Sequence, residues 1–346
     1  MKPFLQHPRP AWGYRILLVC VSACLPVMAM AETASASTPL VVQFDQPAED
    51  WESQGLPIGN GAMGAVIAGG VARDIIQFNE KTLWSGGPGA EGYDFGWPAA
   101  SRTAALAQAR QTIAEQGSLA PEAAARLLGH KIAAYGDYQT FGELHLISEK
   151  IDSDVINYQR RLSLDNAQVD VTYTQAGVNY RREYLASYPD GVIAIRFSAD
   201  QPGQISLTAN LAVPDNRSLE TRIESGRLIA TGKLHSNGLQ FETQIQFVNQ
   251  GGELAQLDHQ KIRVAKADSL VILINAGTDY AQQYPRYRAQ HPHKKLQQAM
   301  NAASKKTLCT DSTRPSQGLP GAVSAREPGY RPAAVSTTYR CAVKKI

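Results

Sequence analysis

The chain has 346 residues, a formal net charge of +3, 43% hydrophobic residues and 19% charged residues. This length suits one large domain or two ordinary ones, and the composition is that of a globular protein with a sizeable core. The net charge is small, and the Lys and Arg residues are scattered rather than gathered in a stripe. We therefore expect no nucleic-acid partner.

Residues 1–31 are predicted to be a signal peptide. Basic residues precede a mostly apolar stretch, Ile16–Ala29, that is too short to span a bilayer comfortably. Ala29-Met30-Ala31 has the pattern of a cleavage site. These features predict an exported protein, periplasmic or secreted, without a membrane span. Cleavage before Cys24, as in a lipoprotein, is the alternative that the sequence leaves open.

The cysteines agree with export because they lie only near the two ends of the chain. Cys20 and Cys24 fall in the leader, and Cys309 and Cys341 lie close to the C-terminus. Residues 32–308 therefore cannot hold a disulfide framework or a cysteine-based metal site. The histidines show neither an H-x₃-H nor an HExxH arrangement, so we expect no zinc site and no cofactor.

Residues 32–39 form a Ser/Thr/Ala linker, and Leu40–Phe44 is the first predicted strand. The stretch from Trp51 to Pro88 then alternates glycines with apolar pieces of strand length, Ala65–Ala68 and Ile75–Phe78. Its glycines suit a positive φ or a close approach of the backbone. It ends in a cluster of polar and aromatic residues that is compatible with sugar binding.

Two helices are predicted after this run. Ala99–Gln116 is Ala-rich and carries Leu106 and Ile113 at helical spacing, with Ser101 as a suitable N-cap. Pro121–Leu128 is predicted to be a second helix, ended by a glycine. We expect both helices to form an insertion between strands.

From Tyr138 onward the period of the hydrophobic residues changes from about 3.6 to about 2, which is typical of strands. The predicted strands are Glu143–Ile147, Asn157–Leu164, Ala167–Thr174, Val178–Ser187, Val192–Ser198, Ile205–Ala212, Arg227–Lys233, Leu239–Val248, Lys261–Val264 and Ser269–Ile274. Short Gly-, Asn- and Asp-containing turns separate them. Many short alternating strands with regular turns predict a mainly β fold, a large antiparallel β-sandwich with a short helical insertion.

Charged residues also occur on these strands, at Arg160, Arg161, Arg181, Arg182 and Glu183. We interpret them as cross-strand charge pairs on a solvated face of the sheet, rather than as a binding site.

The glycine-rich run carries two motifs in order, LPIGNG at Leu56–Gly61 and QFNEKTLWSG at Gln77–Gly86. They resemble the opening motifs of family-95 glycoside hydrolases, the α-L-fucosidase family. Further similarity occurs at Tyr138–Leu144, Tyr158–Asp165 and Gly177–Pro189, and also at Ala276–Tyr280. The resemblance implies that residues 40–306 are the N-terminal β-sandwich domain of such an enzyme.

The resemblance also implies where catalysis takes place. In this family the reacting groups, a Glu acid and a water assisted by Asn or Asp, belong to an (α/α)₆ barrel that follows the sandwich. No catalytic residue can therefore be assigned to a position in this chain.

The candidates for carbohydrate binding, or for an interface with the barrel, are Asn60, Asn79, Glu80 and Trp84. The amides and the carboxylate can bond sugar hydroxyls, and an indole can stack on a sugar face. The same residues can instead fix loops or the contact between sandwich and barrel, and this structural role is the interpretation we favour.

The composition and the hydrophobic pattern of the sequence change after Lys306. Residues 307–346 contain four prolines, two cysteines and no sustained period, so we expect a disordered or non-native tail. Synonymous codons can be chosen for Leu308–Gly329 that, one nucleotide later, give SAQTQHAHLKDYQALFQRVNL, similar to a run of the family linker. We therefore hypothesise that Leu308–Ile346 is translated out of frame. The codons for Gln317–Ser324 decide it.

These observations predict a truncated glycoside hydrolase of the α-L-fucosidase type that lacks its catalytic barrel, with a fucosylated oligosaccharide as its possible partner. The chain alone is expected to be inactive. Two alternatives stay open: a stand-alone carbohydrate-binding sandwich and an inert structural remnant. Titration with fucosylated and plain oligosaccharides distinguishes them.

Overall fold

The computed structural model of the chain describes residues 39–87, 90, 92–93, 102–129, 135–150, 154–284 and 286–311, with side chains described as far as Lys306 in the last helix. The predicted leader at 1–31, the linker as far as residue 38 and the tail beyond residue 311 lie outside the described residues. The predictions made for those segments stay predictions.

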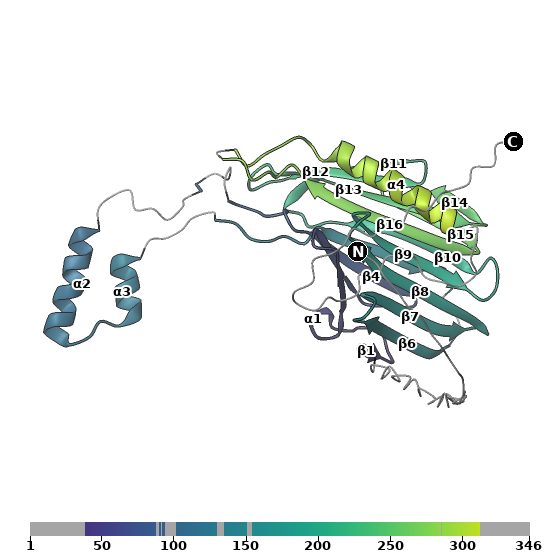
Figure 1. Cartoon of the computed structure of the whole chain (residues 1–346), viewed down its shortest axis with the longest axis horizontal. Helices are drawn as coiled ribbons and strands as arrows, with labels where there is room; N and C mark the ends of the chain where they lie inside the picture. Colours follow the sequence, from purple (N-terminus) through teal and green to yellow (C-terminus); the bar gives the residue numbers. More distant parts are fainter. Residues whose placement is uncertain are drawn as a thin grey trace, which may run out of the picture. The chain divides into compact units, whose positions relative to one another are not determined.

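The described chain forms two antiparallel sheets that pack face to face (Figure 1). Sheet A has the order β1 (Val41–Phe44), β6 (Val155–Ser163), β7 (Gln168–Gln175), β8 (Val178–Ser187), β9 (Val192–Ala199), β16 (Ser269–Thr278), β13 (Gln240–Gln250), β12 (Arg227–Leu234) and β11 (Arg217–Glu224). Sheet B has the order β14 (Glu253–Gln256), β15 (Lys261–Ala267), β10 (Ile205–Ala212), β5 (Gly142–Ser148), β4 (Arg73–Glu80), β3 (Met63–Ile67) and β2 (Leu56–Gly59). The predicted antiparallel sandwich is confirmed. The sequence analysis missed β2, β11 and β14.

The core lies between the two sheets because alternate side chains of most strands point inward. In β4 every second residue from Asp74 to Glu80 is buried, and β7 shows the same alternation. Three aromatic rings join the sheets near one end. Phe141 stacks on Phe78 at 5.2 Å and meets Phe241 edge-on at 5.3 Å. Such pairs stabilise beyond the area that they bury.

Helix α4 (His293–Asp311) covers part of the outer face of sheet A, and the sequence analysis missed it (Figure 1). It packs on β9, β13 and β16, where Met300 and Ala303 lie over Val271 and Leu273. This explains why the first seven residues of β16 are all buried, since the strand is covered on both faces. The helix runs on to Asp311, past the predicted start of the tail at residue 307.

The predicted helical insertion is confirmed. Helix α2 (Thr103–Gln116) begins after Arg102, which makes no side-chain capping bond, and the predicted cap at residue 101 lies outside the described residues. Helix α3 (Pro121–Leu128) ends at Gly129, as predicted. A third helix, α1 (Trp51–Gln54), is one turn long and was not predicted.

The interpretation of the strand charges as residues of a solvated face is wrong for Arg160, Arg182 and Glu183, which are all buried. Arg161 and Arg181 point outward from sheet A, whereas their neighbours point inward and are 0% and 4% exposed. Arg182 donates to the carbonyl oxygens of Gly70 and Val71 at 2.6 and 2.9 Å. Arg160 likewise donates to backbone carbonyls. The charged neighbours alternate between the two faces of the sheet. The solvated-face interpretation holds for Arg181, which pairs with Asp170 at 2.6 Å.

Candidate functional site

The two motifs of the glycine-rich run fold into one hairpin-rich corner of sheet B. LPIGNG forms β2 and the turn into β3, and QFNEKTLWSG forms the second half of β4 and the loop that follows. The inner faces of these strands bury Leu56, Ile58 and Met63 in the core. The candidate residues therefore lie at strand ends and loops, with apolar side chains fixing their positions.

Asn60 closes the turn between β2 and β3 and is fully engaged there. Its Oδ1 accepts from the backbone N–H groups of Ala62 and Met63 at 3.1 and 2.8 Å. Its Nδ2 donates to the carbonyl of Ser187, at the end of β8 in sheet A, at 3.1 Å. The side chain is buried. Asn60 therefore ties the two sheets together and is not available to bind a sugar.

Glu80 ends β4 with its carboxylate turned into the sandwich. It is 6% exposed, and Oε2 accepts from the backbone N–H and the hydroxyl of Thr82 at 2.9 and 2.6 Å. The Thr82 hydroxyl in turn contacts that of Thr278, at the end of β16, at 2.5 Å. Burial raises the pKa of Glu80, against the lowering effect of the Thr82 hydrogen bonds. This chain of contacts joins the two sheets, whereas the structural interpretation placed these residues in loops or at the contact with the barrel.

Asn79 lies on the opposite face of β4, because consecutive strand residues point to opposite sides. It pairs with Gly64 of β3 and is half-buried on the outer face of sheet B. The structure therefore does not bring Asn79 and Glu80 together, and they cannot bind the same sugar hydroxyl.

Trp84 is the one exposed member of the predicted group. Its indole is 47% exposed, and its Nε1 donates to the carbonyl of Lys81 at 3.0 Å. The ring lies beside that of Tyr138, with centroids 5.3 Å apart and planes tilted by 50°. The two residues also face each other across an antiparallel bridge. Tyr138 is 45% exposed, so the pair presents two aromatic rings to solvent on one rigid support.

Amide side chains hold this aromatic pair from both sides. Asn237 Nδ2 donates to the carbonyls of Trp84 and Gly86 at 2.9 and 2.7 Å. On the other side, Gln139 Nε2 donates to the Ser85 hydroxyl and to the Asp137 carbonyl, both at 3.1 Å. The β4–β5 loop is thereby joined to the turn after β12. Sequence analysis missed Asn237 and Gln139 as site residues, although both lie in stretches that it singled out as a turn and as a family-like segment.

A buried arginine is linked through Asn216 to Gln139, the residue after Tyr138. Arg217 opens β11, is 5% exposed, and donates to the Phe141 carbonyl at 3.0 Å while its guanidinium stands over the Phe241 ring. Its Nε donates to Asn216, whose amide donates to Gln139 at 2.7 Å. No ion pair within the described ranges involves Arg217, and burial lowers its pKa to about 10.

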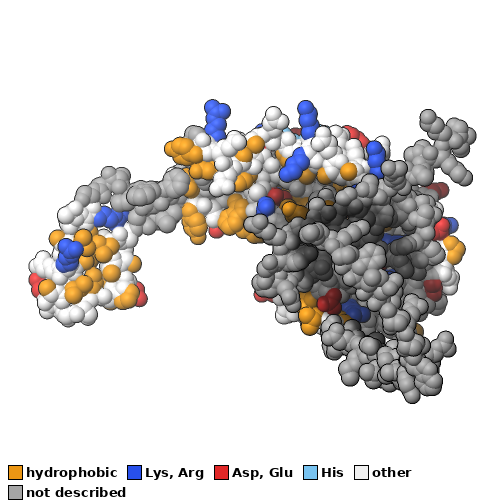
Figure 2. Space-filling view, in the orientation of Figure 1, with side chains coloured by type: hydrophobic (Ala, Val, Ile, Leu, Met, Phe, Trp, Pro, Cys, Tyr) orange, Lys and Arg blue, Asp and Glu red, His pale blue; other side chains and the backbone are white. Residues whose placement is uncertain are grey.

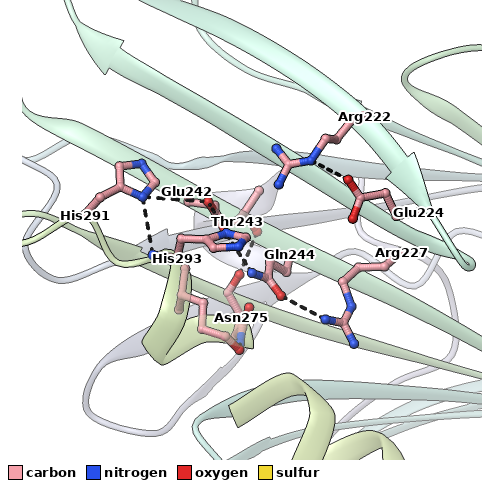
Figure 3. A network of polar contacts seen from close by, with 10 residues as sticks. Arg222, Glu224, Arg227, Glu242, Thr243, Gln244, Asn275, His291 and His293 are labelled. Carbon is pink, nitrogen blue, oxygen red and sulfur yellow. Dashed lines mark hydrogen bonds and ion pairs between the residues drawn. The ribbon is translucent and has the colours of Figure 1, made fainter. Parts of the chain in front are cut away.

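A second polar cluster holds the start of α4 (Figure 3). The fully buried Glu242 accepts from His293 Nδ1 at 2.9 Å and from Gln244 Nε2 at 2.6 Å, and His291 lies 3.9 Å away. Asn275 Nδ2 donates to the carbonyl of Leu296 at 2.8 Å. These contacts fix the helix on sheet A, so the cluster is explained by packing. Sequence analysis did not connect these residues, because they meet only through the tertiary fold.

The inward-facing and paired acids share one property, which is that each is occupied by a partner inside the protein. The buried acids among them are Asp74 with Tyr184 and Arg182, Glu80 with Thr82, Glu183 with Arg181, Glu242 with His293, and Asp279 with the N–H of Gln240. A glycosidase of the usual type needs two carboxyl groups facing one cleft, roughly 5–10 Å apart. Within the described ranges, no cluster of three or more His, Cys, Asp or Glu side chains fits a metal ion. None of the described helices is both long and apolar enough to cross a membrane.

Comparison with known proteins shows similarity to glycoside hydrolases. A family model described as glycosyl hydrolase family 65, N-terminal domain, matches residues 42–283. The chain is 29% identical over 280 residues to alpha-L-fucosidase 2 of Arabidopsis thaliana, covering 73% of this chain and 32% of that protein. It is 34% identical over 145 residues to the probable alpha-fucosidase A of Aspergillus niger, covering 42% of this chain and 18% of that protein.

A solved structure described as "Putative kojibiose phosphorylase from human microbiome" aligns with a TM-score of 0.47 and 10% identity, over 79% of this chain and 36% of that one. The chain covers 32% and 18% of the length of the two curated relatives.

Proposed function

The chain belongs to the family described as glycosyl hydrolase family 65, N-terminal domain, and from this premise we propose that it supplies the N-terminal sandwich of an α-L-fucosidase-like hydrolase acting on fucosylated glycans. The observation that carries the proposal is the extent of the family match. Residues 42–283 are nearly the whole sandwich, and both curated relatives are named as fucosidases. The motifs at Leu56–Gly61 and Gln77–Gly86 support family 95 as the finer assignment.

The reacting groups, on this proposal, lie on another domain. The state of Glu80 supports this, because its carboxylate is buried and bonded to Thr82 instead of facing solvent. The sandwich then acts as a scaffold and as a recognition surface, and the chain by itself has negligible hydrolase activity. Export through the predicted leader at residues 1–31 is part of the same proposal.

The experiment is a domain exchange with the plant relative. The region of alpha-L-fucosidase 2 that matches this chain is replaced by residues 39–306, and release of fucose from a fucosylated oligosaccharide is measured. We expect the folded chimera to release fucose and the present chain alone to release almost none. A chimera that folds, by circular dichroism, but is inactive contradicts the proposal, as does substantial fucose release by the chain alone.

A second candidate function is a stand-alone glycan-binding module. The exposed Trp84–Tyr138 pair favours it, because such a pair can bind sugar without any catalytic group. Glycan binding by the chain alone, together with a folded chimera that releases no fucose, is the result that favours the stand-alone module over the hydrolase domain.

A further inference from the structure

We propose that Trp84 and Tyr138 form a binding platform for a neutral sugar ring of a glycan. This inference rests on the proposed function for the class of ligand. What it adds is the position of the site, the residues that make the contact and the charge of the sugar.

The two rings are exposed although hydrogen bonds hold the backbone that carries them. Trp84 and Tyr138 are 47% and 45% exposed, and Tyr135, three residues before Tyr138, is 69% exposed, whereas the core rings Phe78, Phe141 and Phe241 are completely buried. Figure 2 shows hydrophobic side chains gathered at the end of the sandwich that bears the β4–β5 loop. Exposed large aromatics on a fixed support are typical of recognition surfaces, because little conformational entropy is lost on binding.

Several hydrogen bonds fix the backbone around residues 84–86 and 137–139, which carries the two rings. Ser85 and Asp137 exchange two backbone hydrogen bonds, at 2.9 and 3.2 Å. Asn237 donates to the carbonyls of Trp84 and Gly86, and Gln139 donates to the Ser85 hydroxyl. The Gly86 N–H donates to the Ser236 hydroxyl at 3.2 Å. These amides bond the backbone beneath the rings, so the ring faces stay in place without a ligand. Preorganisation of this kind lowers the cost of binding.

A further argument is the shape and charge of the platform. Two rings tilted by 50°, with centroids 5.3 Å apart, form a shallow angle that can receive the apolar face of a pyranose. The exposed charges nearby, Lys81 and Asp137, have opposite signs. Arg217 is shielded beneath the support. A neutral sugar with an apolar face, such as a 6-deoxyhexose or its neighbour in the glycan, fits this surface better than an anionic one.

The test is calorimetric titration of the full chain with three oligosaccharides: a fucosylated one, the same backbone without fucose, and a sialylated one. We expect Trp84→Ala to weaken binding of the neutral glycan at least about tenfold, and Trp84→Tyr, which keeps a ring, to weaken it less. The matched control is Trp51→Ala, which removes an indole that is 56% exposed on α1, and we expect no change in affinity.

The outcomes separate the inference from the proposed function. Wild-type binding that Trp84→Ala leaves unchanged, no binding of any glycan, or preference for the sialylated one overturns the platform. A change of oligomeric state in Trp84→Ala, measured by analytical ultracentrifugation without a change in glycan affinity, also overturns it in favour of a protein contact. The domain-exchange assay decides the proposed function independently, because fucose release by the wild-type chimera does not depend on the result for Trp84.

Discussion

Strand β4 joins two ends of the sandwich that differ in how their polar groups are held. Asp74 and Glu80 both point inward from this strand, and six steps along the strand place them about 20 Å apart. At the Asp74 end, Tyr184 donates to the carboxylate at 2.5 Å and Arg182 lies 3.5 Å away. At the Glu80 end, the acid is bonded to the hydroxyl and N–H of Thr82, and Trp84 stands exposed four residues further along.

We propose from this difference that the Asp74 end stabilises the fold and that the Trp84 end faces a ligand. At the Asp74 end, Gly69 has a positive φ of 74°, and a Cβ there would lie 2.6 Å from Arg160 and 2.7 Å from the Tyr158 hydroxyl. Charged and phenolic groups thus pack tightly against the backbone at Gly69. At the Glu80 end, amides hold a loop strip whose aromatic rings remain open to solvent.

The largest expected effect is the loss of Arg182. Replacing it with Met leaves the Asp74 carboxylate buried without its cationic partner and leaves the carbonyls of Gly70 and Val71 without a donor. We expect the free energy of unfolding to fall by about 3–5 kcal/mol, measured by urea denaturation. Arg222→Met is the matched control, because its ion pair with Glu224 lies on the surface, and we expect a change of less than about 1 kcal/mol. Equal losses in the two variants would contradict a special role for the Asp74 end.

A smaller effect is expected for the loop clamp at the other end. Asn237→Ala removes the hydrogen bonds to the carbonyls of Trp84 and Gly86 and the one accepted from Leu239 N–H. We expect the free energy of unfolding to fall by about 1–2 kcal/mol and glycan affinity to fall with it, because the strip under Trp84 loosens. Asn249→Ala, which removes a single surface bond to Gly251, is the control. Unchanged affinity in Asn237→Ala would show that the ring positions do not depend on this clamp.

The smallest effect concerns pH. Burial raises the pKa of Glu80 above its ordinary value of 4.5, so the folded state binds this proton more tightly than the unfolded state. The resulting stabilisation is fully present below pH 4.5 and is lost as the pH rises through the higher folded pKa. Glu80→Gln keeps an acceptor for Thr82 but cannot ionise. We therefore expect the variant to gain stability relative to wild type as the pH increases across this window, in thermal unfolding series. A constant difference would contradict the raised pKa.

Much of the fold could be predicted from the sequence because period-2 alternation is a local signal. Strands such as β7 and β8 follow from their alternating residues alone. The short edge strand β14 and the polar edge strand β11 were missed, since edge strands bury little and show a weak pattern. Helix α4 was missed because it buries only a narrow apolar stripe, Leu296, Met300 and Ala303.

Less of the site could be predicted, because residue type does not reveal which side of a strand a residue faces. Asn79 and Glu80 are adjacent in the sequence, but they point to opposite faces of sheet B. Arg182 follows Arg181, yet one is buried and the other pairs on the surface. Tyr138 lies next to Trp84 only because β4 and β5 pair. Of the four predicted residues, Asn60 and Glu80 are buried and bonded inside the sandwich, whereas Asn79 and Trp84 remain candidates for direct contact with a ligand.

The most direct test of the difference between the two ends is to measure unfolding and glycan binding on the same two variants, Arg182→Lys and Trp84→Ala. The account predicts that Arg182→Lys lowers the free energy of unfolding and leaves the glycan dissociation constant unchanged. It predicts the reverse for Trp84→Ala, with stability preserved and binding weakened at least about tenfold. Loss of stability in Trp84→Ala as large as that in Arg182→Lys, with binding intact, would contradict the account.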